Sequence, residues 1–238
     1  MMGKSYDDPA WELLLDQMSF DETVDFIRDA FHGRSALKSI QSPGTRDENG
    51  PTGLNTTFMA GEQSATAFAS PFVMGSTFNN ELIYQVGYVI GNDCLRYGIS
   101  ALYGPGVNTH RTAYGGRNFE YFSEDPRLSG AMAAAITLGV QQEDGFYVTV
   151  KHYACNNQED NRNFVSSNLS ERTLREIYLR GFEICVREGG AKSIMTSYNK
   201  INGVWGHYHY DLAQTILRGE WDFDGMVMTD WWMQYSAS

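Results

Sequence analysis

The 238-residue chain has few of the features that would assign it to a membrane, secreted or nucleic-acid-binding class. It has no apolar run close to the roughly 20 residues that a membrane-spanning helix needs. Its first residues do not resemble a secretory signal peptide. Basic residues are scarce, with 18 Lys and Arg against 29 Asp and Glu, and the net charge of −11 argues against nucleic-acid binding.

Cysteine and proline are also sparse. The three cysteines, Cys94, Cys155 and Cys185, form an odd set without CxxC spacing, so we expect buried reduced thiols and a cytoplasmic location. Only 6 prolines accompany 24 glycines, which excludes a low-complexity chain. A hydrophobic content of 42% is enough for the core of one large or two small domains.

Short apolar runs alternate with amphipathic stretches along most of the chain. The expected strands are 65–69, 99–103, 147–150, 193–196 and 226–229, preceded by one short strand within the loops of 33–64. The expected helices are 20–31, 79–97, 126–142, 171–188 and 212–217. Strands separated by helices predict a parallel sheet with right-handed crossovers.

Both a doubly wound sheet and a (β/α)8 barrel fit this alternation. No glycine-rich phosphate loop follows an early strand, and polar side chains follow nearly every strand, which favours the barrel. We predict an α/β, TIM-like (β/α)8 barrel that is incomplete, with about six strand–helix units. Residues 1–48 are expected to form an N-terminal helix and entry loops, and 49–238 a partial barrel, within one domain overall.

The residues after the strands suggest chemistry on a sugar. Lys151 and His152 end one strand, and Arg117, Tyr198 and Asp230 are expected at corresponding strand ends. Recognition of a hexose needs several cationic and amide donors in a small space, with an aromatic face beneath the ring. A carboxylate beside such donors, backed by Trp231, suits the stabilisation of an oxocarbenium ion.

Four sequence blocks resemble the barrel domain of glycoside hydrolase family 3, the family of many β-glucosidases. They are GRNFEYFSEDP at 116–126, VKHYACNNQE at 150–159 with Arg162, MTSYN at 195–199 with Asn202-Gly203, and GMVMTDW at 225–231. The resemblance covers about residues 50–235. The form of the second block is similar to the β-glucosidase branch, because it lacks the proline- and glycine-rich loop of the N-acetylglucosaminidase branch.

The resemblance implies a retaining hydrolase that releases terminal β-D-glucosyl residues from a small β-glucoside or oligosaccharide, without a cofactor or metal. Asp230 would be the nucleophile and would form a covalent glycosyl-enzyme. The substrate-binding residues would be Arg117, Lys151 and His152, with Tyr198 beside the nucleophile and Met195 and Trp231 lining the pocket. Glu159 and Arg162 are expected to form a structural ion pair, and Glu120, Glu124 and Asp125 to brace loops or cap a helix.

Two features depart from the family pattern. Asn49 stands where the family commonly has the Asp of Asp-Gly-Pro, and a neutral amide makes a weaker hydrogen bond than a carboxylate; Asp47 or Glu48 would replace it only if the loop shifted. The family's acid/base Glu lies in a separate α/β sandwich domain that nothing here resembles. We therefore expect a fragment of a longer enzyme, or a chain completed by that domain or a partner chain, with weak hydrolysis on its own.

Two other readings stay open. A metal-dependent barrel hydrolase could use His207 and His209 with His110, His152 and Asp230, although the first two lie in a loop. A carbohydrate-binding barrel without turnover is favoured by Asn49 and by the missing acid/base, and is opposed by the intact Asp230, Lys151 and His152.

Overall fold

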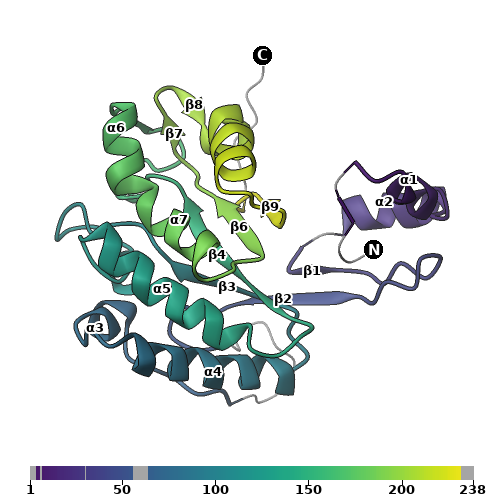
Figure 1. Cartoon of the computed structure of the whole chain (residues 1–238), viewed down its shortest axis with the longest axis horizontal. Helices are drawn as coiled ribbons and strands as arrows, with labels where there is room; N and C mark the ends of the chain where they lie inside the picture. Colours follow the sequence, from purple (N-terminus) through teal and green to yellow (C-terminus); the bar gives the residue numbers. More distant parts are fainter. Residues whose placement is uncertain (1–3, 6, 30, 56–63, 232–238) are drawn as a thin grey trace.

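The computed structural model describes residues 4–5, 7–29, 31–55 and 64–231, and it shows an α/β fold on a six-stranded sheet (Figure 1). The strand order is β1-β2-β3-β4-β6-β9, parallel throughout from β2 to β9, with β1 antiparallel at one edge. The strands are β1 Gly33–Arg34, β2 Thr45–Asn49, β3 Ala101–Gly106, β4 Tyr147–Tyr153, β6 Ser193–Thr196 and β9 Met226–Met228. The predicted parallel sheet is confirmed.

Two helices precede β1, and the others follow β2 along the chain. They are α1 Ala10–Leu15, α2 Phe20–Arg28, α3 Pro71–Gly75, α4 Asn80–Arg96, α5 Pro126–Val140, α6 Glu171–Thr173 and α7 Arg180–Arg187. Two further segments, Leu174–Tyr178 and Asp211–Glu220, are π-helical. A small sheet of β5 Ser166–Ser167, β7 Lys200–Ile201 and β8 Val204–Trp205 lies beyond β6. None of the described helices is long and apolar enough to cross a membrane.

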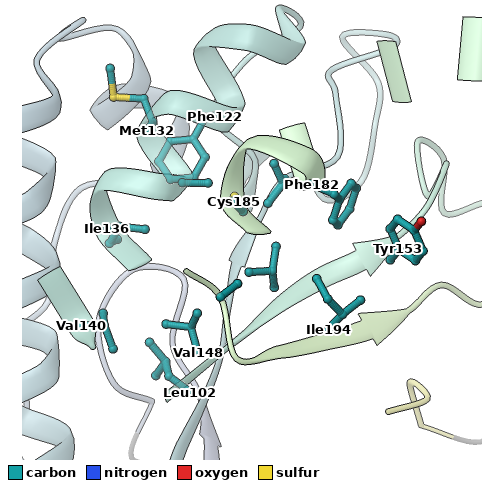
Figure 2. Packing of buried hydrophobic residues seen from close by; sticks show 14 of the residues in the cluster. Leu102, Phe122, Met132, Ile136, Val140, Val148, Tyr153, Phe182, Cys185 and Ile194 are labelled. Carbon is teal, nitrogen blue, oxygen red and sulfur yellow. The ribbon is translucent and has the colours of Figure 1, made fainter. Parts of the chain in front are cut away.

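One face of the sheet carries the core. α5 packs between α4 and α7 and contacts β3 and β4, and the three helices form a single layer in Figure 1. Leu102, Val148 and Ile194 point from their strands toward this layer (Figure 2). Neighbouring positions face the other side, as alternation along a strand requires, and Tyr103 and Tyr147 line a pocket there.

Side-chain hydrogen bonds at the N-termini of α2 and α5 explain where these two helices begin. Ser19 and Glu22 form the predicted reciprocal capping box of α2, although this helix ends at Arg28 rather than Phe31. Asp125 accepts hydrogen bonds from the first turn of α5, directly before Pro126, as predicted. The buried thiols of Cys94, Cys155 and Cys185 are confirmed as unpaired.

Four sequence-based expectations about secondary structure differ from the structure. Residues 65–69 are not a strand but an extended loop, in which the Phe68 N–H donates to the Thr52 carbonyl. Two short strands, β1 and β2, occupy the region for which one was expected, and the strand predicted at 99–103 is shifted to Ala101–Gly106. The helix expected at 171–188 is divided among α6, the π-helical turn and α7. The division at 48/49 falls within β2 and stays a prediction.

Candidate active site

The parallel strands bring the predicted site residues to the carboxyl edge of the sheet. Asn49 is the last residue of β2, and Lys151 and His152 lie near the end of β4. Tyr198 follows β6 by two residues, and Asp230 follows β9 by two. Because the carboxyl ends of parallel strands lie together, residues far apart in sequence meet at this edge.

A pocket of about 390 Å³ opens at this edge and holds three of the predicted sugar-binding residues. Asn49, Arg117 and Lys151 line it, together with Phe119, Glu120 and the backbone of the glycine-rich turn at 50–53. Its size falls in the range of small-molecule sites. The pocket thus offers an amide, two cations and an aromatic ring to a bound ligand.

Glu120 holds the two cations of this pocket. Its carboxylate pairs with the Arg117 guanidinium through one oxygen and lies 3.4 Å from Lys151 Nζ through the other. Burial raises the pKa of Glu120, but Lys151 and Arg117 outweigh it and leave the pKa below its ordinary value. Burial likewise lowers the pKa of Lys151, against the opposing charge of Glu120. One ionised carboxylate therefore compensates two cations away from water.

Asp230 lies beside His152. Its Oδ2 is 3.7 Å from His152 Nε2, and its Oδ1 accepts the backbone N–H of Trp231 at 2.8 Å. Burial raises the pKa of Asp230, whereas the Trp231 N–H and the nearby cations oppose that shift. Burial, followed by the charges of Arg117 and Lys151, holds the pKa of His152 well below 6.5, so its imidazole is neutral.

Tyr198 is buried next to Asp230. Burial first, and then the charge of Asp230, raises the pKa of Tyr198 to about 12, so its hydroxyl keeps its proton. The Arg162 guanidinium lies 4.4 Å from the centre of the Tyr198 ring, and it also forms the predicted ion pair with Glu159 at 2.7 Å. Met195 is buried in β6, beside Met228 of β9.

The structure does not bring Trp231 into the pocket that Arg117 and Lys151 line. Its ring stacks on His32 at 4.8 Å and lies 5.4 Å from Tyr103. These residues line a separate pocket of about 270 Å³ on the face of the sheet opposite α4, α5 and α7. The sequence offered no sign of this contact, because His32 lies in the N-terminal segment, almost two hundred positions away.

The neighbours of Asn49 do not replace it. Asp47 accepts a hydrogen bond from the Tyr103 hydroxyl at 3.3 Å and lines the separate pocket of about 270 Å³. Glu48 is buried and pairs with Arg46 at 3.2 Å. Asn49 is therefore the side chain that β2 contributes to the 390 Å³ pocket.

Sequence reasoning gave no role to three polar residues that support His152. Asn108 donates to the His152 carbonyl at 2.9 Å and accepts its N–H at 2.8 Å. The Tyr121 hydroxyl lies 3.1 Å from His152 Nδ1, and Asn156 Nδ2 donates to that hydroxyl at 3.1 Å. Tyr121 and Asn156 do lie within conspicuous sequence blocks, so polar side chains there were the available signal.

The histidines considered as metal ligands do not gather. His207 stacks with Trp205, His110 contacts the Tyr121 carbonyl at 3.0 Å, and His152 faces Tyr121 and Asp230. Within residues 4–5, 7–29, 31–55 and 64–231, no group of three or more His, Cys, Asp or Glu side chains could hold a metal ion.

The chain resembles known β-glucosidases over most of its length. It is 45% identical over 198 residues to a β-glucosidase of Ruminococcus albus, covering 82% of this chain and 20% of that protein. It is 40% identical over 228 residues to a β-glucosidase of Rhizobium radiobacter, covering 94% and 28%. The chain thus spans about a fifth to just over a quarter of the length of these relatives.

The fold resembles the same proteins. β-Glucosidase 3B from Thermotoga neapolitana, solved in complex with α-D-glucose, superposes with a TM-score of 0.86 at 38% identity, covering 94% of this chain and 34% of that one. Residues 48–238 match the profile described as the glycosyl hydrolase family 3 N terminal domain. The chain belongs to glycosyl hydrolase family 3.

Proposed function

We propose that this chain carries the glucose pocket and the nucleophile of a retaining β-glucosidase. The observation that supports this most strongly is the position of the Asp230 carboxylate, 3.7 Å from His152 at the strand edge that also presents the Lys151–Glu120–Arg117 cluster. Its relatives are named β-glucosidases, and the Thermotoga neapolitana enzyme was solved with α-D-glucose.

The pocket residues would bind the glucosyl hydroxyls. Lys151 and Arg117 offer charged donors and Asn49 an amide within the pocket. The neutral His152 ring, which does not line that pocket, would offer a further hydrogen-bonding nitrogen beside Asp230. Glu120 fixes the two cations in place, so little reorganisation is needed when a sugar binds. The Phe119 ring supplies an apolar surface at the same pocket.

Asp230 would attack the anomeric carbon. A carboxylate oxygen forms the new bond, the glycosidic C–O bond breaks, and the leaving-group oxygen takes a proton from a general acid. The nearby cations favour the ionised form of Asp230, which the attack requires, and the protonated Tyr198 lies next to it. Water then hydrolyses the glycosyl-enzyme.

The general acid is proposed to come from a region outside this chain. Glu120 pairs with Arg117 and Lys151, and Glu159 pairs with Arg162. Because a nearby cation favours the ionised form of a carboxylate, neither Glu120 nor Glu159 is suited to donate a proton to the leaving group. We infer that an α/β sandwich domain or a partner chain supplies that acid. We likewise infer that the curved parallel sheet is part of a (β/α)8 barrel.

A mechanism-based inhibitor tests the assignment of Asp230. A 2-deoxy-2-fluoroglucoside with an activated leaving group needs no general acid for the first step, so the isolated chain should be labelled. Mass spectrometry of the digested protein should find one added fluoroglucosyl group on the peptide that contains Asp230. The variant Asp230→Asn should take no label, whereas Asp224→Asn, which changes an exposed carboxylate near the same strand, should be labelled normally.

A carbohydrate-binding barrel without turnover is the second candidate. The observation that favours it is the neutral Asn49 in the pocket, where weaker hydrogen bonding limits the hold on a glucosyl group. Binding of glucose without any labelling of Asp230 would support this function and refute the nucleophile.

A further inference from the structure

A continuous line of hydrogen bonds leads from Arg162 to His152. Arg162 Nη1 donates to Glu159 Oε2 at 2.7 Å, and Asn156 Nδ2 lies 3.2 Å from Glu159 Oε1. A carboxylate paired with an arginine only accepts hydrogen bonds. The Asn156 amide must therefore present its nitrogen, not its oxygen, to Glu159, which fixes the orientation of the amide.

The orientation of Asn156 determines what Tyr121 can do. The same Asn156 nitrogen uses its second hydrogen toward the Tyr121 hydroxyl, 3.1 Å away. The Tyr121 hydroxyl accepts the hydrogen bond from Asn156 through a lone pair of its oxygen. Its single hydrogen is therefore available to donate to another partner. The nearest partner is His152 Nδ1 at 3.1 Å, and both rings are buried.

The position of His152 is fixed at its backbone as well. The Asn108 side chain makes two hydrogen bonds to the main chain of His152, one to the N–H at 2.8 Å and one to the carbonyl at 2.9 Å. With the backbone and Nδ1 both held, the ring has one free nitrogen, and Nε2 faces Asp230 Oδ2 at 3.7 Å.

We propose that the Glu159–Asn156–Tyr121 line fixes His152 in one tautomer, in which Nδ1 is bare and the hydrogen sits on Nε2, facing Asp230. Tyr121 and Asn156 are then positioning residues, which act on the nucleophile through His152. This inference rests on the proposed function of Asp230.

The tautomer matters for the charge beside the nucleophile. A neutral imidazole with its hydrogen on Nε2 presents the positive end of an N–H dipole to the Asp230 carboxylate and to a sugar hydroxyl between them. The other tautomer would present a lone pair to the carboxylate, and the two would repel. Tyr121 and Asp230 therefore favour the same tautomer, and the Tyr121 hydrogen bond strengthens the preference that the carboxylate already imposes.

Nitrogen NMR of the 238-residue chain tests the tautomer directly. With 15N-labelled histidine, the chain has only five histidines whose ring signals must be distinguished, and His152→Gln identifies those of His152. We expect His152 Nδ1 to show the shift of an unprotonated nitrogen and Nε2 that of an N–H. In Tyr121→Phe, which removes one oxygen from a buried ring, we expect the two signals to move toward each other as the tautomers mix.

Tyr153→Phe is the matched control. Tyr153 is also buried, but its hydroxyl donates to the Leu212 carbonyl at 3.0 Å and has no part in the line to His152. Its loss should leave the His152 nitrogens unchanged. Labelling of Asp230 by the fluoroglucoside should slow about tenfold in Tyr121→Phe, the effect of roughly one hydrogen bond, and stay the same in the control.

The proposal is overturned if His152 of the unmutated chain carries its hydrogen on Nδ1, a result that needs no variant to fold. It is equally overturned if Tyr121→Phe and Tyr153→Phe give the same His152 signals. Absence of label on Asp230 would refute the glycosidase function instead, and the NMR result would still decide whether the tautomer is fixed.

Discussion

Replacing Glu120 by glutamine should show how much the stability of the fold depends on the carboxylate that Arg117 and Lys151 share. The Glu120 and Lys151 side chains are each 4% exposed, and Arg117 is 19% exposed, so water screens neither ion pair well. Glu120→Gln keeps the shape of the side chain and removes its charge. The two cations then remain close together without compensation.

The expected loss of stability is about 3–5 kcal/mol, the usual cost of removing one partner of a buried ion pair. An independent upper limit comes from Lys151, which can escape by losing its proton. From an ordinary pKa of 10.5, this costs about 5 kcal/mol at pH 7, at 1.36 kcal/mol per pKa unit. Because burial already lowers the pKa of Lys151, the real limit lies below this value.

The difference in the free energy of unfolding between the unmutated chain and Glu120→Gln should become smaller as the pH falls. The folded-state pKa of Glu120 lies below the ordinary value of 4.5, so its ionised form stabilises the fold fully above about that pH. As the pH falls through the lowered pKa, Glu120 becomes neutral like glutamine. The free energies of unfolding of the two proteins should therefore converge in acid.

Urea unfolding followed by tryptophan fluorescence measures these free energies. Glu124→Gln removes an exposed carboxylate from the same loop and should change the free energy of unfolding by less than about 0.5 kcal/mol. Equal losses for Glu120→Gln and Glu124→Gln at pH 7 would refute the reasoning, as would a difference that grows in acid.

Two other substitutions test the packing and the pocket. A Cβ on Gly139 would overlap the Tyr84 carbonyl oxygen between α5 and α4, so Gly139→Ala should destabilise by about 1–3 kcal/mol in urea; Gly219→Ala, whose Cβ would lie 3.3 Å from the Gln214 carbonyl oxygen, should cost less. Asn49→Asp adds a carboxylate to the pocket of Lys151 and should tighten glucose binding about tenfold by calorimetry; unchanged affinity would place glucose elsewhere.

The sequence predicted most of the elements that position the site. The apolar run at 147–150 indicated β4, and the polar residues that follow it indicated where His152 would lie, because strand direction carries over to the edge of a parallel sheet. The strand before Asp230 was informative for the same reason, whereas Arg117 lies in a loop before the 3-10 turn Asn118–Glu120 rather than at a strand end. Local patterns sufficed wherever the site is set by the end of a strand.

The rest depends on contacts that no local pattern encodes. The stacking of Trp231 on His32 joins distant segments, and the sharing of Glu120 between Arg117 and Lys151 appears only once the loop folds over β4. Residues 65–69 have a strand-like composition, yet they form a loop that is held to Thr52 by a backbone hydrogen bond. In this segment a long-range hydrogen bond outweighs the weak preference of the local sequence for a strand.

The order of the residues along the chain has a consequence for synthesis. Asn49, Arg117, Glu120 and Lys151 leave the ribosome well before Asp230, which follows the last described strand. Since folding generally proceeds from the N-terminal part of a protein during translation, Arg117, Glu120 and Lys151 can come together before Asp230, the nucleophile under the proposed function, has been made. Under the proposed function, the residues that would bind the sugar are thus synthesised before the residue that would attack it.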